Sequence, residues 1–211
     1  MKTFALSSLF IGIILTGFTS SFAQSEKKPE FFAGYSFEDI DTGIKSSDLN
    51  TTTSLDNRFK ANGFQLSGAA YFTKRFGIAG DFSANYKSRS DVFGATTGQT
   101  KFSLYNVTGG PQVRFPSASR FTPFAQALAG FARRNFTETI AATSTSFSDN
   151  KTSFAMNFGG GVDYNLSKRL AWRLFQIDYN PVFLKARTVN STAIPNHTLN
   201  GFRFSTGIVI K

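Results

Sequence analysis

The feature that most constrains this chain is an alternation of apolar with small or polar residues, at a period of two, repeated in eight segments. In residues 154–165, for example, Phe154 and Phe158 alternate with Ala155 and Asn157. Successive side chains of a β-strand point to opposite faces, so this period predicts strands. The other segments with this pattern are residues 31–38, 64–73, 76–87, 105–115, 121–133, 170–180 and 201–211. We therefore expect an all-β chain.

Two of these segments alternate less regularly. In residues 121–133 the odd positions are the apolar ones, with Gln126 on the even side. In residues 170–180 Arg173 falls on the apolar parity. Either a β-bulge shifts the register there, or the Arg173 side chain snorkels to a membrane interface.

The N-terminus has the pattern of an export signal. Lys2 precedes a mostly apolar stretch over residues 4–18, and Ser21 and Ala23 give small residues at the −3 and −1 positions of a cleavage site. The apolar stretch is shorter than the roughly 20 residues that a membrane-anchor helix needs, which is the alternative. We expect residues 1–23 to be a cleaved signal peptide, residues 24–30 a short periplasmic segment, and residues 31–211 the folded domain.

Composition excludes several classes of site. The chain has no Cys and a single His, His197, which excludes disulfides, iron–sulfur centres, thiolate zinc sites and a Cys nucleophile. The formal net charge is +10, but Lys and Arg are scattered and form no basic tract or helical stripe, so we expect no nucleic-acid partner. No cofactor and no metal site are predicted.

Three features favour a membrane barrel, whose apolar face meets lipid, over a soluble secreted barrel, which would hide that face. The polar face is crowded with small residues, as the narrow interior of an eight-stranded barrel requires. Short connections (74–75, 116–120, 167–169) alternate with long ones (39–57, 88–100, 135–152, 181–198). Aromatic residues gather at the strand ends, as interfacial girdles do: Phe72, Phe76, Phe115, Phe121, Tyr164 and Trp172 at one rim, and Tyr86, Phe102, Phe131, Phe154 and Tyr179 toward the other. We predict an eight-stranded antiparallel up-and-down transmembrane β-barrel with short periplasmic turns and long extracellular loops.

The segments 63–68 (GFQLSG), 77–82 (GIAGDF) and 122–124 (TPF), together with the export signal, resemble small bacterial outer-membrane β-barrel proteins. The likeness is to the OmpA barrel domain and to OmpX-like proteins. It implies an integral, monomeric protein in the outer membrane of a Gram-negative cell envelope, inserted by the barrel-assembly machinery. Family members commonly end on an aromatic residue that this machinery reads, whereas Ile208, Ile210 and Lys211 stand here. Their long loops carry adhesion or host-factor contacts, although no residue of this chain identifies a partner.

Eight strands leave an interior that side chains fill, so a wide channel is not expected. We predict a polar network in the lumen, because charges in so narrow a space must be paired. Its candidate members are Asp81, Arg114, Asp163, Asp178 and Arg203. The network is either a structural plug or a gate whose ion pairs exchange partners to pass small ions.

Basic residues also gather at the long-loop ends of the strands. There they would meet the phosphates of lipopolysaccharide in the outer membrane, or else serve only as solubilising charge. These candidate rim residues are Arg58, Lys60, Lys87, Arg89, Lys101, Arg133, Arg134, Lys151, Lys185 and Arg187.

Nothing in the sequence supplies a nucleophile with its base. His197 is followed by Thr198 and lacks the His-x-Ser-Asn arrangement of lipid A deacylases, so no catalytic residue is predicted. The function expected is a structural or interaction role at the cell surface. A narrow, gated pore for ions or small solutes is the alternative, and a lipid-modifying enzyme is a distant one.

Overall fold

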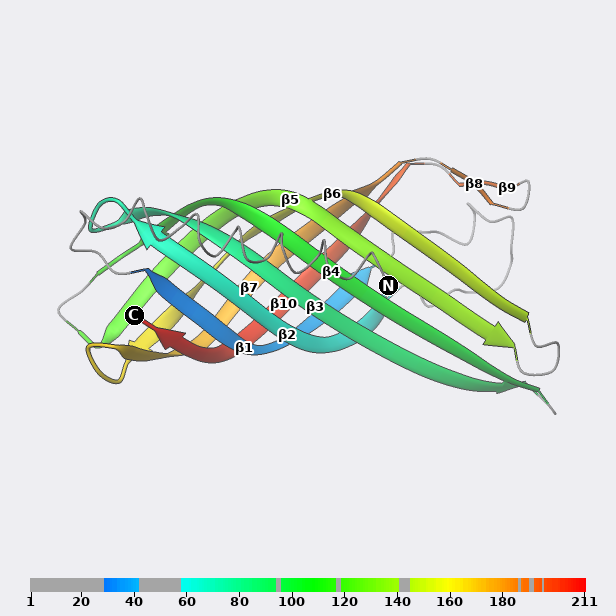
Figure 1. The fold of residues 1–211 in the computed structure, drawn as a ribbon, viewed down its shortest axis with the longest axis horizontal. Coiled ribbons are helices and arrows are strands. Elements are labelled where there is room, and N and C mark those ends of the chain that lie inside the picture. The colour runs from blue at the N-terminus through cyan, green and yellow to red at the C-terminus, as the bar shows by residue number, and fades with distance from the viewer. Residues whose placement is uncertain are drawn as a thin grey trace, which may run out of the picture.

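The computed structural model describes residues 29–41, 58–93, 96–116, 119–140, 145–185, 187–189, 192–194 and 196–211. Eight strands close into one antiparallel barrel in the order β1-β10-β7-β6-β5-β4-β3-β2 (Figure 1). Their bounds are β1 Glu30–Asp41, β2 Arg58–Tyr71, β3 Phe76–Phe93, β4 Thr96–Arg114, β5 Phe121–Ile140, β6 Thr145–Asn165, β7 Leu170–Leu184 and β10 His197–Ile210. Two short strands, β8 (Arg187–Val189) and β9 (Thr192–Ile194), form a separate hairpin. Each barrel strand lies beside its neighbours in sequence, which confirms the predicted up-and-down barrel.

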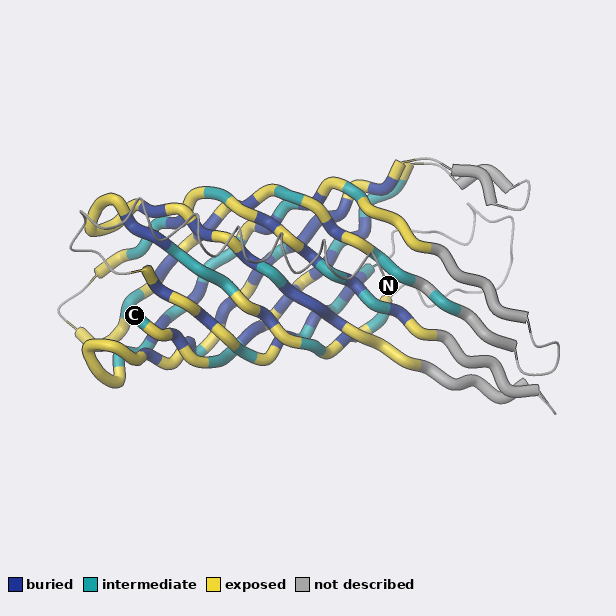
Figure 2. Tube along the Cα trace, in the orientation of Figure 1, coloured by how far each residue is buried: buried dark blue, intermediate teal, exposed yellow. Residues whose placement is uncertain are grey.

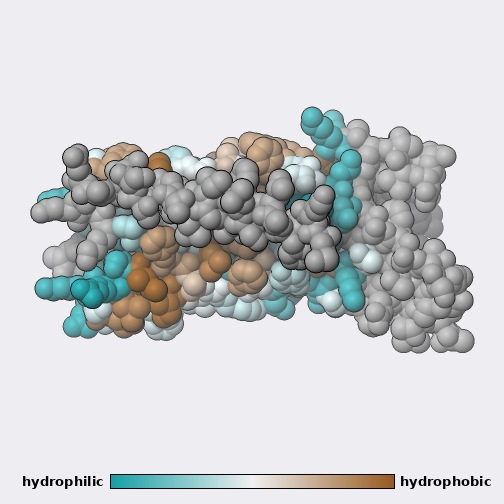
Figure 3. All heavy atoms as spheres, viewed as in Figure 1, coloured by the Kyte–Doolittle hydropathy of each residue, from teal (hydrophilic) through white to brown (hydrophobic). Residues whose placement is uncertain are grey.

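The alternation read from the sequence separates the inside of the barrel from the outside. Buried and exposed residues alternate along the strands (Figure 2). Outward Phe131 and Val107 are 63% and 59% exposed, whereas inward Arg203 is 1% exposed. On the face seen in Figure 3, apolar residues occupy the middle of the barrel and hydrophilic ones lie toward its ends. A closed sheet also pairs its backbone groups internally, so the chain can present this apolar band to lipid.

A β-bulge in β7 explains the irregular parity around Arg173. Asp163 of β6 pairs with Arg173, but the next pair is Val162 with Phe175, so Leu174 is the extra residue. The register with β10 shifts at the same place. The bulge turns Arg173 into the lumen, where it is 4% exposed. Of the two interpretations of the sequence, the register shift is confirmed.

Short turns connect the strands at the end of the barrel where β2, β4 and β6 finish. In the β2–β3 turn, Thr73 Oγ1 accepts hydrogen bonds from the backbone N–H groups of Arg75 and Phe76, at 3.2 and 2.7 Å. Ser167 Oγ does the same for Arg169 and Leu170 in the β6–β7 turn, at 3.2 and 3.1 Å. These hydroxyls pair amides that have no strand partner within the turn.

The opposite end of the barrel differs from the prediction. Residues 88–100 and 135–152, predicted as loops, are mostly strand, since β3 and β4 pair as far as Phe93 with Thr96, and β5 and β6 as far as Ile140 with Thr145. These four strands extend past the ends of β1, β2 and β7 (Figure 1). Both segments are rich in Thr, a β-branched residue that favours strands even where both faces of the strand are polar. The predicted loop 39–57 falls largely on residues 42–57, outside the described part of the chain.

The predicted signal peptide, residues 1–23, also lies outside the described residues. Strand β1 begins at Glu30, one residue before the predicted start of the barrel domain. In the part of the chain that the structure describes, no helix is long and apolar enough to cross a membrane.

Candidate functional site

Arg203 of β10 lies at the centre of the polar part of the lumen. Its Nη2 donates hydrogen bonds to Asp81 Oδ1 at 3.0 Å and to Asp178 Oδ2 at 2.8 Å. Its Nη1 donates to Ser83 Oγ at 2.6 Å. The side chains of Arg203 and Asp178 are fully buried, and that of Asp81 is 1% exposed. The barrel thus brings together three of the five predicted network residues, from strands β3, β7 and β10.

The two carboxylates of this cluster are also held by amide side chains. Gln176 Nε2 donates to Asp178 Oδ2 at 2.7 Å, and Gln126 Nε2 donates to Asp178 Oδ1 at 3.2 Å. Gln65 Nε2 donates to Asp81 Oδ2. The attraction within a buried ion pair offsets desolvation only if further hydrogen bonds satisfy the remaining lone pairs. These amides supply such hydrogen bonds to both carboxylates of the cluster.

A fourth buried acid, Glu38 of β1, was not among the predicted network residues. Its side chain accepts hydrogen bonds from Asn180 Nδ2 at 3.0 Å and from Asn85 Nδ2. Ser36 Oγ in turn donates to Asn85 Oδ1 at 2.9 Å. The alternation of β1 does place Glu38 on the inward face, so strand parity was the signal that could have found it.

Asp163 pairs with Arg173 rather than with Arg203. The Arg173 guanidinium binds both Asp163 oxygens, at 2.8 and 3.2 Å, and donates from Nη1 to Gln176 Oε1 at 2.7 Å. It lies between the rings of Phe32 and Phe124, 4.4 and 4.2 Å from their centroids. Through Gln176 this pair is continuous with the Arg203 cluster. Only the bulge makes Arg173 available to the lumen.

Arg114 lies at the short-turn end of the lumen, apart from the Arg203 cluster. Its Nη1 donates to Glu30 Oε1 at 2.8 Å and its Nε to the Lys74 backbone oxygen at 3.0 Å. Its guanidinium also covers the ring of Tyr71, 4.0 Å from the centroid. The five predicted residues therefore belong to three ion-pair groups at successive levels of the lumen, and Glu30 and Arg173 complete them.

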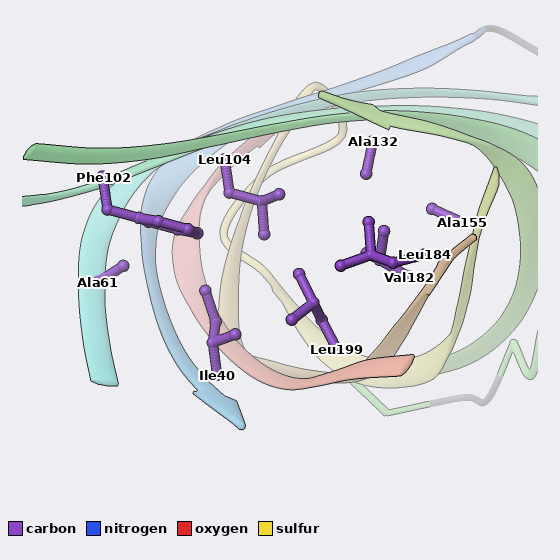
Figure 4. Close-up of a cluster of buried hydrophobic side chains, with 9 residues drawn as sticks. All are labelled: Ile40, Ala61, Phe102, Leu104, Ala132, Ala155, Val182, Leu184 and Leu199. Atoms are coloured by element: carbon purple, nitrogen blue, oxygen red, sulfur yellow. The ribbon is translucent and has the colours of Figure 1, made fainter. Parts of the chain in front are cut away.

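The extracellular part of the lumen is apolar, contrary to the small, polar interior expected from the sequence. Inward side chains from seven strands form one buried cluster just beyond the Arg203 and Glu38 level (Figure 4). Its members are Ile40, Ala61, Phe102, Leu104, Ala132, Ala155, Val182, Leu184 and Leu199. Phe102 was predicted as a girdle residue, but its even position in β4 points it inward, and its ring packs edge-on against Phe59 at 4.3 Å. We call this cluster the apolar layer.

The predicted rim residues fall at the extracellular strand ends, but parity divides them. Arg58, Lys60, Lys101, Arg133 and Lys185 have the outward parity of their strands, and Lys87, Arg134 and Lys151 the inward one. The side chains of Arg89 and Arg187 lie outside the described residues. Arg58 is paired with Asp39 at 3.1 Å on the outer surface. The predicted rim residues are thus divided between the outer surface and the lumen side of the barrel, and they do not form one continuous basic surface.

His197 is the first residue of β10 and pairs with Leu184 of β7 at the extracellular end. Among the described residues there is no group of three or more His, Cys, Asp or Glu side chains that could hold a metal ion. The buried carboxylates instead bind guanidinium and amide groups. The described buried carboxylates of the lumen are therefore engaged in ion pairs and hydrogen bonds.

Comparison with known proteins gives a family. A family model described as the outer membrane protein beta-barrel domain matches residues 11–200. A search of curated proteins finds no significant match.

Solved structures with this fold are also outer-membrane barrels. Ail, the attachment invasion locus protein of Yersinia pestis, aligns at a TM-score of 0.53 and 18% identity, over 88% of this chain and 99% of Ail. Neisserial surface protein A aligns at 0.55 and 13%, over 89% and 99%. OprG from Pseudomonas aeruginosa aligns at 0.49 and 12%, over 89% and 97%. The family model covers most of the chain, and the barrel turns an apolar band outward, so this chain belongs to the outer membrane protein β-barrel domain family and is an integral protein of a Gram-negative outer membrane.

Proposed function

We propose that this chain is a sealed outer-membrane barrel with a structural or interaction role at the cell surface, and that it is neither a channel nor an enzyme. The observation that carries this proposal is the full burial of the Arg203 side chain between Asp81 and Asp178 in the middle of the lumen. A guanidinium held by two carboxylates and a serine, with its side chain fully shielded from solvent, supports a lumen that is closed at that level.

The lumen is filled at other levels as well. The apolar layer lies on the extracellular side of Arg203, and the Arg173 guanidinium, between Phe32 and Phe124, lies on the periplasmic side. An ion would have to pass a polar plug and a dry segment in series. Side chains fill the interior of eight-stranded barrels in general, which agrees with this arrangement.

The alternative of a narrow, gated pore has one observation in its favour. Arg203 bridges two carboxylates instead of one, with Glu38 in the same region of the lumen. A guanidinium with more than one acid within reach can exchange partners. For catalysis the described residues offer no comparable observation.

At the surface, the proposed partners are lipids and polyanions. Outward cations at the extracellular strand ends are placed to meet lipopolysaccharide phosphates. The similar barrel Ail was crystallised with the heparin analogue sucrose octasulfate, which is itself a polyanion. Strands β3 to β6 extend past the other strands at the same end of the barrel (Figure 1).

Planar-bilayer conductance of the folded mature protein tests the proposal. We expect a silent bilayer, with insertion verified by protease protection in vesicles made from the same preparation and with a conducting porin as positive control. Reproducible unitary steps would contradict the sealed barrel and favour the pore. Lipid A mass analysis, with and without the protein, tests the enzyme alternative, and we expect no change in acylation.

A further inference from the structure

Three aromatic side chains form a continuous row on the outer surface of β5, β6 and β7. In the ladder Phe131 pairs with Phe154, which pairs with Phe183, and all three are exposed. The rings of Phe154 and Phe183 stack with centroids 5.9 Å apart. Because the three strands are adjacent, these rings form one apolar shelf that faces lipid.

A polar row lies directly on the extracellular side of this shelf. Two residues further along the same outward face of each strand are Arg133 in β5, Thr152 in β6 and Lys185 in β7, all exposed. Arg133 Nε donates to Asn135 Oδ1 at 3.3 Å. Two cations therefore flank a hydroxyl above the aromatic shelf.

The pairing between β6 and β7 ends at the level of the aromatic shelf. The pairing of β6 with β7 extends outward only as far as Phe154 with Phe183, while β6 continues to Thr145 beside β5. The divergence leaves a cavity of about 650 Å³, whose lining includes all three Phe residues, Lys151, Thr152 and Lys185. The lining thus combines apolar rings with cations and hydroxyls, and it continues onto Leu184 of β7 and onto residues 196–198 at the start of β10.

Charge distinguishes this cavity from the rest of the rim. On β1 and β2, Arg58 is ion-paired with Asp39, and Lys60 is directly opposite Asp39 in the ladder. Among the described side chains on the outward face of β5, β6 and β7, no carboxylate lies on the extracellular side of the aromatic shelf. Among these described side chains, no acid therefore lies beside Arg133 and Lys185 to offset their positive charge.

We propose that this cavity and the outward face beside it bind a phosphorylated glycolipid of the outer leaflet, of the lipid A type, with its acyl chains on the aromatic shelf and its phosphates between Lys185, which lines the cavity, and Arg133, which pairs with the lining residue Thr152 in the ladder. The inference rests on the proposed surface role and names the partner. The two cations lie two strands apart, about 10 Å at the usual strand spacing, which suits a headgroup wider than one phosphate. Cations at this depth bind anionic headgroups, and hydroxyls such as that of Thr152 suit sugar oxygens.

Native mass spectrometry of the mature protein, folded in detergent and titrated with diphosphoryl lipid A, tests the assignment. We expect one lipid A per wild-type barrel, with affinity reduced about tenfold or more in Arg133→Ala/Lys185→Ala. The control Arg58→Ala/Lys60→Ala removes the same charge from the same rim and should stay within about twofold of wild type. Phe131→Ala/Phe183→Ala should weaken binding while the barrel keeps its heat-resistant mobility on gels, which checks folding.

Three further probes identify the ligand. Dephosphorylated lipid A and phosphatidylglycerol should bind weakly, and inorganic phosphate should not displace lipid A. Equal binding by the Arg133/Lys185 variant, by phosphatidylglycerol or by the dephosphorylated lipid would overturn the assignment, as would displacement by free phosphate. The bilayer test is independent of this one: a conducting barrel that retains lipid A refutes the seal alone, and a silent barrel without lipid A refutes the lipid site alone.

Discussion

Gly159 of β6 faces Asp178 across the β6–β7 ladder, and its missing side chain leaves room for the carboxylate that holds Arg203. A Cβ at Gly159 would collide with Asp178 Oδ1 and with the backbone oxygen of Ile177. The backbone of a neighbouring strand cannot move away without disturbing the ladder. The size of residue 159 therefore sets the position of the Arg203 cluster.

We expect Gly159→Ala to lower the free energy of unfolding by about 1–3 kcal/mol, the usual cost of overpacking a filled interior. Urea unfolding of the barrel in detergent micelles, followed by the fluorescence of Trp172, measures the change. Gly80→Ala is the matched control, because nothing lies within 4 Å of a Cβ built at Gly80. Equal stability of the two variants would show that Asp178 can shift at little cost.

At the scale of one element, the bulge in β7 decides which residues enter the lumen. Thr206 of β10 holds the bulge: its Oγ1 donates to the Arg173 backbone oxygen at 2.9 Å and accepts from Trp172 Nε1 at 3.2 Å. If Leu174 took a regular strand position instead of bulging, strict alternation would place Arg173 on the same face as Phe175. An arginine facing lipid costs about 2–4 kcal/mol at the bilayer midplane and less near the interface.

Deleting Leu174 should remove the bulge yet keep Arg173 beside Asp163, because Arg173 would then directly precede outward-facing Phe175 and regular alternation places neighbouring residues on opposite faces, so we expect this variant to refold. The fraction of heat-modifiable, folded barrel after refolding into detergent measures the effect. Leu174→Ala keeps the extra residue and should refold almost as well as wild type. If the deletion variant fails to refold while Leu174→Ala refolds, the local geometry of the bulge is itself needed for folding, beyond the facing of Arg173.

At the scale of the whole molecule, the lumen is closed by layers of different chemistry. The ion pairs of Arg114 and Arg173 lie toward the periplasm, the Arg203 cluster lies in the middle, and the apolar layer lies beyond it. Each layer takes its residues from several strands, so the layers can assemble only when the strands close into the barrel. A mutation that opens one layer should leave the other layers intact.

Arg203→Ala should lower the free energy of unfolding by about 3–5 kcal/mol, because the carboxylates of Asp81 and Asp178 stay buried without their cation. We expect the bilayer to remain silent, since the apolar layer still closes the lumen. Adding Leu104→Ala and Leu199→Ala removes bulk from that layer, and unitary steps should then appear. Arg120→Ala, in an exposed turn, is the control for stability and should change it by less than about 0.5 kcal/mol. If Arg203→Ala conducts as well as the triple variant, the apolar layer is no barrier.

The sequence by itself determined that the chain has eight barrel strands and which residues of most strands face inward. Side-chain alternation is a local property of an extended backbone, so Phe154 and Asn157 reveal their faces without any knowledge of the neighbouring strands. For the same reason Asp81, Asp178 and Arg203 could be assigned to the lumen, and Glu38 could have been.

The tertiary structure alone decided which of these residues meet. Arg203 and Asp81 are 122 positions apart in the chain and bind each other only because closure of the sheet brings β3 and β10 to opposite sides of a narrow lumen. Arg114 and Asp163 lie at a different height along the barrel axis from Arg203. These heights depend on strand tilt and register, which the alternation of side chains does not encode. The bulge that turns Arg173 inward also arises from its pairing, because an extra residue is defined only against the strands beside it.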